Sequence, residues 1–184
     1  MEINQQFEVA RPAPTVWEFF QDVPAVATCL PGAELLDEQG DGNYEGRVTV
    51  KLGPMTATFE GACLVMPDPE AWTGRLEGKG VDKRGGSRGN VKVDYRVTET
   101  DGGHTSVAID ADVTLAGAIA QFGRTGLVNE ISSRLMVEFV DCLEAKLAAP
   151  TPEAAAEVRA GEVKGVSLFF ASLWSWIKGL FKRS

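Results

Sequence analysis

The sequence predicts an α+β fold in which an antiparallel sheet packs against one long helix. Residues 33–115 contain short runs of alternating apolar and polar residues, separated by turn signals and with no helical segment between them. Residues 117–147 then lack proline and repeat apolar residues at helical spacing, which predicts a helix about 45 Å long. Its apolar stripe comprises Ile119, Phe122, Leu127, Ile131, Leu135, Phe139, Leu143 and Leu147.

Composition sets the limits on this fold and its partners. A chain of 184 residues with 44% hydrophobic content forms one domain with a tail, and a net charge of −8 argues against nucleic acid as a partner. The three cysteines (Cys29, Cys63 and Cys142) form no CxxC pair, so we expect no disulfide framework or zinc site and a reducing compartment. The first residues resemble no secretory signal, which predicts a cytoplasmic protein.

The N-terminal elements precede the sheet. Residues 2–10 alternate as a half-buried strand, residues 14–20 form a short helix started by proline, and a second short helix runs from Asp22 to Cys29. Pro31-Gly32 then predicts a type II turn. Cys29 could be a reactive thiol or a small buried packing residue, and packing is favoured because the sequence supplies no nearby histidine.

Six strands in succession are expected over residues 33–115. The turn signals are Asp41-Gly42, Gly53-Pro54, Pro67-Asp68-Pro69 and Asp101-Gly102-Gly103, with a looser loop over 81–90. Short connections without helices predict an antiparallel meander.

Glycines are unusually frequent on the inward face that the alternation defines. The small inward residues are Gly46, Ala57, Gly61, Gly74, Gly78, Gly80 and Ala111. They can mark bulges that bend the sheet around the helix. They can also leave an apolar cavity between sheet and helix, and we favour this second interpretation because bending and hollowing occur together.

Catalytic chemistry by this chain alone is not expected. The single histidine, His104, follows a glycine turn, and Asp110 and Asp112 lie on the outward face. The glycine-rich runs 78–80 and 85–89 match no phosphate-binding motif. We therefore predict that the protein is not an enzyme and holds no metal or covalent cofactor.

The start of the long helix contains Gly117, Gly123 and Gly126, each of which costs up to ~1 kcal/mol in a helix interior. Close packing on the sheet and a wider pocket mouth explain them equally well. Arg124, near that mouth, could bind a carbonyl, a lipid headgroup or a partner carboxylate, or form a surface salt bridge.

The composition changes after Leu147. Residues 148–165 are rich in Ala, Pro and Glu and are expected to form a flexible linker, helical in part at 153–160. Residues 166–184 carry three bases and no acid, which leaves −11 on the first 165 residues, and they form an amphipathic helix on a helical wheel. A transmembrane span is disfavoured by Lys178 and the serines. A helix in the plane of an anionic membrane fits best, with docking on the protein's own core or in a partner groove as alternatives.

Several motifs together resemble one family. They are Val16-Trp17, Asp22, Cys29-Leu30-Pro31-Gly32, Tyr44-x-Gly46, Lys51-x-Gly53-Pro54, Phe59-x-Gly61, Gly78-x-Gly80 and Gly117-x-x-Ala120-Gln121-x-Gly123-Arg124. Over residues 1–147 the chain resembles the CoxG family, named for a subunit of carbon monoxide dehydrogenase. The resemblance implies a START-like (SRPBCC) helix-grip fold that holds an apolar ligand. It also implies a role in membrane recruitment or quinone supply for a molybdenum hydroxylase of the carbon monoxide dehydrogenase type.

These inferences combine into one expected function. A helix-grip domain (1–147) binds a hydrophobic small molecule, which the resemblance indicates is an isoprenoid quinone, and a linker (148–165) joins it to a membrane-binding helix (166–184). The predicted pocket residues are Tyr44, Val48, Ala57, Phe59, Gly61, Trp72, Leu76, Tyr95, Ala111, Ile119, Phe122, Gly123 and Leu127. The predicted membrane-binding residues are Phe169, Phe170, Leu173, Trp174, Trp176, Ile177, Lys178, Leu180, Phe181, Lys182 and Arg183. A tether without a ligand and an assembly factor for the hydroxylase are the alternatives.

Overall fold

The fold is a seven-stranded antiparallel sheet with helices on one face. The computed structural model describes residues 1–52, 55–124 and 127–160. The strand order is β1-β7-β6-β5-β4-β3-β2, and every neighbouring pair is antiparallel, as the sequence predicts. The strands are β1 (Glu2–Val9), β2 (Ala33–Gly40), β3 (Asn43–Leu52), β4 (Met55–Asp68), β5 (Thr73–Asp82), β6 (Ser87–Thr100) and β7 (His104–Ala116).

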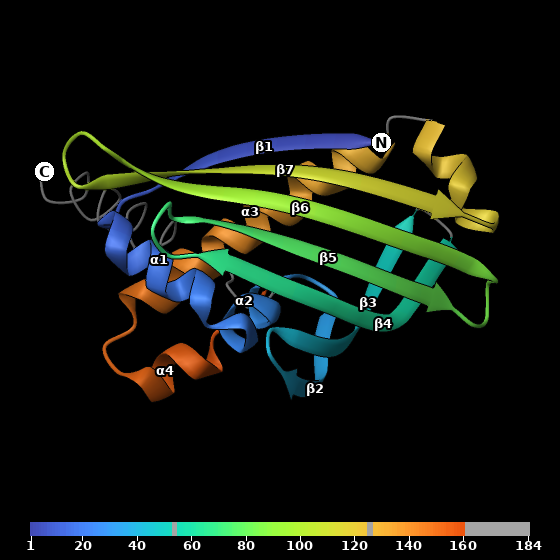
Figure 1. Ribbon diagram of the computed structural model, residues 1–184, viewed down its shortest axis with the longest axis horizontal. Helices are drawn as coiled ribbons and strands as arrows, with labels where there is room; N and C mark the ends of the chain where they lie inside the picture. The colour runs from blue at the N-terminus through green and yellow to red at the C-terminus, as the bar shows by residue number, and fades with distance from the viewer. Residues whose placement is uncertain (53–54, 125–126, 161–184) are drawn as a thin grey trace, which may run out of the picture.

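The helices gather on one face of this sheet (Figure 1). The two short helices expected after β1 are present, and α3 packs against β1, α2 and α4. Their bounds are α1 (Ala13–Gln21), α2 (Val23–Cys29), the 3₁₀ helix η1 (Ala118–Arg124), α3 (Leu127–Ala148) and α4 (Pro152–Glu157). In Figure 1, α1 and α2 lie near one end of α3, with α4 beside them.

The long helix is shorter than predicted. Its apolar stripe over 117–147 suggests one continuous helix, but η1 occupies 118–124 and α3 begins only at Leu127. Gly117 adopts φ +82°, and a Cβ there would lie 2.6 Å from the Gly86 carbonyl oxygen. Only glycine tolerates that backbone, and the glycines at 123 and 126 lower the helix propensity further.

The expected loop over 81–90 is a tight turn instead. β5 continues to Asp82 and β6 begins at Ser87. The Asp82 carboxylate accepts hydrogen bonds from the backbone N–H groups of Arg84 (3.0 Å) and Gly85 (3.1 Å), which closes the turn. The Gly53-Pro54 turn lies outside the described residues.

Aromatic rings fill the main core between α1, α3 and the sheet. Phe20 stacks on Tyr95 with ring centroids 5.1 Å apart, and Phe139 of α3 lies within 6.3 Å of Phe7, Phe19 and Phe20. Edge-to-face and offset pairs of this kind add about 0.5–1.5 kcal/mol each beyond the area that they bury. This end of the helix layer is therefore closed and well packed.

One cysteine expectation is wrong. Cys29 at the end of α2 and Cys142 in α3 form a disulfide, with Cα atoms 5.4 Å apart, and Cys63 is the remaining free thiol. Cys29 is fully buried, as a packing residue would be, but it is bonded. The two cysteines are 113 residues apart and meet only because α2 packs on α3, so local spacing could not reveal the pair.

Part of the predicted linker folds back on the domain. Thr151 caps α4 by accepting a hydrogen bond from the Ala154 N–H, and the Lys146 ammonium of α3 donates to the Ala155 carbonyl at 2.8 Å. The backbone N–H of Ala160 donates to the Thr28 carbonyl of α2 at 3.0 Å. Residues 149–160 thus lie against α2 and α3 and do not act as a free tether, whereas residues 161–165 lie outside the described residues.

Candidate functional site

A row of glycines crosses the sheet where it curves most closely on itself. Gly46 of β3 pairs with Gly61 of β4, Gly61 pairs with Gly80 of β5, and Gly80 pairs with Gly89 of β6. A Cβ on Gly61 would collide with the Lys79 carbonyl oxygen and lie 2.8 Å from the Gly80 Cα. The absence of side chains along this row lets the strands approach closely and leaves space above the inward face.

That space forms an apolar cavity of about 330 Å³ between α2 and the inward face of the sheet, which we call the α2–sheet cavity. Its strand residues follow the inward alternation that the sequence predicts, and its other wall is α2 with the turn that follows. The apolar residues around it are Val23, Val26, Ala27, Leu30, Ala33, Leu35, Gly46, Val48, Phe59, Gly61, Cys63, Leu76, Val91 and Val93.

Three local features hold α2 in place as the cavity wall. The Asp22 carboxylate caps the helix by accepting a hydrogen bond from the Ala25 N–H at 2.9 Å. At the other end, Gly32 adopts φ +79°, and its carbonyl accepts a hydrogen bond from the Thr49 N–H at 2.8 Å. The disulfide from Cys29 joins α2 to α3. The wall is therefore fixed on the sheet side and on the helix side.

The inward wall carries no charge at neutral pH. Its one titratable group is the Cys63 thiol, and burial raises the pKa of that thiol. Tyr44 pairs with Cys63 across the strands, and its hydroxyl reaches the Glu38 carboxylate at 3.5 Å. Burial, followed by the charge of Glu38, raises the pKa of the Tyr44 phenol. Such a wall favours an uncharged, apolar ligand.

The predicted pocket residues divide between this cavity and the closed cores. Val48, Phe59, Gly61 and Leu76 line the α2–sheet cavity. Ala57 and Ile119 form a second core cluster with Phe59, Leu115 and Ile131 as neighbours.

The other predicted pocket residues do not line the cavity. Trp72 and Tyr95 belong to the main core, since the ring of Tyr95 lies over Gly74, where a Cβ would collide with it. Tyr44 lies beside Cys63, and Ala111 is half-buried between Ile3 and Val93 in the register. The side chains of Phe122, Gly123 and Leu127, like all of residues 166–184, lie outside the description, as does the side chain of Arg124.

The sequence interpretation missed the α2 wall, although a signal for it exists. Val23, Val26, Ala27 and Leu30 occur at spacings of three, one and three residues, which is the apolar stripe of a short amphipathic helix. Ala33 and Leu35 follow on β2 with strand alternation. Combining the two patterns would have placed α2 over the glycine-rich strands.

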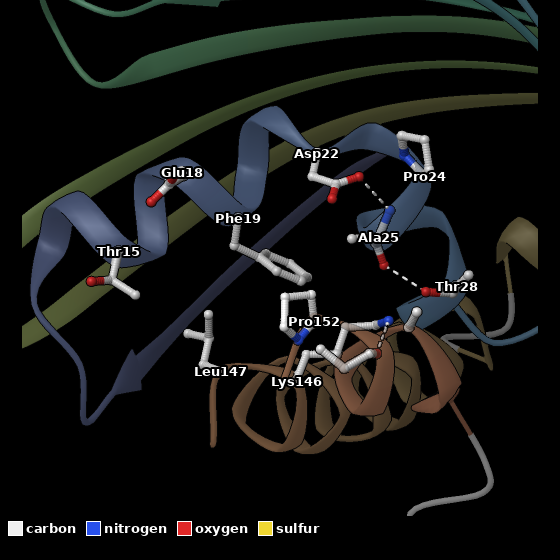
Figure 2. Close-up of a pocket in the computed structure, with 12 residues that line it drawn as sticks. Thr15, Glu18, Phe19, Asp22, Pro24, Ala25, Thr28, Lys146, Leu147 and Pro152 are labelled. Atoms are coloured by element: carbon white, nitrogen blue, oxygen red, sulfur yellow. Dashed lines mark hydrogen bonds between the residues drawn. The ribbon is translucent and has the colours of Figure 1, made fainter. Parts of the chain in front are cut away.

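A second hollow lies on the other side of α2 and is shown in Figure 2. This interhelix groove, of about 470 Å³, lies between α1 and α2 on one side and α3 and α4 on the other. Glu18, Asp22 and Lys146 contribute charges to it, and Figure 2 shows Lys146 bonded to α4 across its floor. Burial lowers the pKa of Lys146, partly offset by the nearby Asp22 carboxylate. Its mixed lining suits an apolar ligand less well than the α2–sheet cavity.

The described residues show no sign of metal chemistry. Over 1–52, 55–124 and 127–160, no three His, Cys, Asp or Glu side chains gather closely enough to hold a metal ion. His104 is exposed beside its turn, and Asp110 and Asp112 are exposed on the outer face, where Asp112 pairs with the N-terminal amine at 3.1 Å. In the same part of the chain, no helix has the length and apolar character needed to cross a bilayer.

Solved structures define the fold class. A conserved protein from Geobacillus kaustophilus is similar, with a TM-score of 0.71 at 16% identity over 80% of this chain and 95% of that one. A START superfamily protein from Mycobacterium smegmatis has a TM-score of 0.52 at 16% identity, over 79% of this chain and 96% of that one. The ZhuI aromatase/cyclase from Streptomyces sp. R1128 has a TM-score of 0.53 at 19% identity, over 85% of this chain and 91% of that one. The chain therefore has a START-like helix-grip fold.

The sequence itself identifies the family within this fold. The profile of CoxG, the carbon monoxide dehydrogenase G-type subunit, matches residues 6–148. This chain belongs to the CoxG family, as its motifs indicate. A comparison with curated protein sequences finds no match.

Proposed function

We propose that this protein binds a lipophilic molecule, an isoprenoid quinone, in the α2–sheet cavity and carries it between the cytoplasmic membrane and a molybdenum hydroxylase of the carbon monoxide dehydrogenase type. The observation that carries the proposal is the uncharged, apolar inner wall of that cavity. Membership of the CoxG family supports the choice of partner. The START-like fold is compatible with ligand binding, although the ZhuI neighbour is named an aromatase/cyclase.

The size of the cavity bears on how a quinone would be held. A volume of 330 Å³ equals that of roughly eleven liquid water molecules at about 30 Å³ each, at the small end of ligand pockets. That matches one quinone ring with its substituents. A long isoprenoid tail would leave through the mouth, where Leu30 and Val48 are 42% and 45% exposed. The chain would therefore bind the ring while the tail remains in the bilayer or along the surface.

In this proposal the amphipathic segment 166–184 binds the membrane surface. Its bases, Lys178, Lys182 and Arg183, would contact anionic headgroups, and its aromatic face would enter the interface. Replacing all three bases with Glu should abolish binding to phosphatidylglycerol vesicles without affecting the fold. Unchanged vesicle binding would remove the membrane from the proposal.

Two alanines on opposite sides of α2 provide a matched test of the ligand site. Ala27 lines the α2–sheet cavity and Ala25 lines the interhelix groove, and both are half-buried. Full-length protein is purified from its own membranes, and the bound lipid is extracted and quantified by mass spectrometry. We expect about one quinone per chain in the parent and in Ala25→Leu, and a loss of at least about tenfold in Ala27→Leu, because added volume in a filled site costs 1–3 kcal/mol.

The alternatives give different results in the same experiment. A protein that carries no quinone in any preparation, yet still binds vesicles, would be a membrane tether. Loss of quinone in Ala25→Leu and not in Ala27→Leu would move the site to the interhelix groove.

A further inference from the structure

The described chain ends against the helix that forms the cavity wall. Ala160 donates its backbone N–H to the Thr28 carbonyl at 3.0 Å, and Val158 packs on the main core. Thr28 belongs to α2, whose Val26 and Ala27 line the α2–sheet cavity. The residues that follow, 161–184, which we call the C-terminal segment, therefore start within one helix diameter of the cavity, about 10–12 Å.

The mouth of the cavity exposes apolar surface. Leu30 and Val48 line it and are 42% and 45% exposed, and Leu36, next to the lining residue Leu35, is 49% exposed. Large side chains exposed together in this way mark a surface that another apolar group covers. β2, at the edge of the sheet, pairs only with β3 among the described strands.

The C-terminal segment has the length and composition to cover that mouth. Residues 161–165 can span up to about 17 Å when extended. The apolar face of 166–184 begins directly afterwards, with Phe169 and Phe170 in its first turns. Aromatic side chains bury about 150–250 Å² each, so two of them can fill an apolar mouth.

Charge complements this match. β2 carries Glu34, Asp37 and Glu38 and no base. The C-terminal segment beyond Val166 carries Lys178, Lys182 and Arg183 and no acid. Of the two bases that line the cavity, Arg47 is paired with Glu34 at 2.9 Å, and Lys79 lies on β5, away from β2.

We propose that, in the absence of a membrane, the C-terminal segment docks in the α2–sheet cavity of its own chain, with Phe169 and Phe170 in the mouth and its bases along β2. An anionic membrane surface competes for the same apolar and basic face and withdraws the segment. Because the segment is tethered, its effective concentration at the cavity is of the order of millimolar, enough to exclude a weakly held ligand from water. The regulatory consequence rests on the proposed function: the cavity opens to its ligand only at the membrane.

The free thiol Cys63 allows a direct test that uses no ligand. Cys63 lines the cavity, while Cys29 and Cys142 are bonded to each other. Phe169→Cys in the full-length protein is oxidised with copper phenanthroline. We expect an intramolecular cross-link to Cys63, because a disulfide forms only between Cα atoms within about 7 Å. Leu168→Cys is the matched control, since Leu168 lies on the polar arc, and we expect at least about tenfold less cross-link from it.

Vesicles and a second variant complete the test. Phosphatidylglycerol vesicles should reduce the Phe169→Cys cross-link by more than half. In a maleimide assay without vesicles, Cys63 should react several-fold faster in Phe169→Ser/Phe170→Ser than in the parent or in Leu168→Ser. Equal cross-linking of both cysteine variants, together with equal Cys63 reactivity in all serine variants, would overturn docking. A dimer-sized cross-linked product would instead assign the cavity to a second copy of the chain. Either failure leaves the quinone extraction result unaffected.

Discussion

The glycine row predicts opposite effects for the same substitution at two of its positions. Gly61→Ala places a Cβ against the Lys79 carbonyl group and 2.8 Å from the Gly80 Cα. Both obstacles are main chain and cannot rotate away. Gly89→Ala, in the same row, places its Cβ 3.6 Å from side-chain carbons of Leu115 and Phe59, which is ordinary van der Waals contact.

The expected magnitudes follow from these contacts. Overpacking costs about 1–3 kcal/mol, and the rigid backbone at Gly61 places that variant at the upper end. Alanine at either position also reduces the entropy of the unfolded chain, which stabilises by about 0.4–1 kcal/mol. We therefore expect Gly61→Ala to lose about 2 kcal/mol and Gly89→Ala to gain up to about 1 kcal/mol. At about 2–4 °C per kcal/mol, the two melting temperatures should differ by roughly 6–12 °C.

Urea unfolding of the full-length protein, followed by circular dichroism, measures both values under non-reducing conditions. Gly89→Ala serves as the matched control for strand propensity and for loss of a glycine. If the two variants have free energies of unfolding within about 0.5 kcal/mol of each other, close approach of the strands at Gly61 is not what requires glycine there.

Further predictions concern α2, α3 and α4. Replacing both Cys29 and Cys142 with Ser should cost up to about 4.8 kcal/mol, because the disulfide closes a separation of 113 residues, and thiol titration of the unfolded, unreduced parent should find one thiol rather than three. Asp22→Ala should cost about 1 kcal/mol in urea unfolding by removing the cap at Ala25, and Asp22→Asn should restore most of it; equal losses would assign the effect to charge. Burial lowers the pKa of Lys146 below its ordinary value of 10.5, so the unfolded state binds more protons between the two values. Stability of the parent relative to Lys146→Met should therefore rise as pH increases towards 10.5, and a difference independent of pH would contradict this.

The order of the elements was predictable because each carries a local signal. Alternating residues, glycine turns such as Asp41-Gly42, and Pro at the start of a helix act over a few positions, and all of them describe the observed strands and short helices. The length of α3 was overestimated because an apolar stripe does not reveal that Gly117 adopts a left-handed conformation against Gly86.

The site was less predictable because it depends on which elements meet. Strand alternation placed Val48, Phe59, Gly61 and Leu76 on the correct face. It could not show that the ring of Tyr95 fills the space over Gly74, or that α2 rather than α3 supplies the described helical wall of the cavity. The Cys29–Cys142 pair was missed for the same reason, since only tertiary packing brings residues 113 positions apart together.

The measurement that tests ligand binding most directly is nuclear magnetic resonance of the full-length protein, titrated with a short-tailed benzoquinone in the presence of bicelles that contain phosphatidylglycerol. The expected result is chemical-shift change concentrated at the backbone amides of Val26, Ala27, Cys63 and Leu76, which surround the α2–sheet cavity. Shifts concentrated instead at Thr15, Ala156 and Leu147, or no saturable shift at any amide, would contradict binding in that cavity.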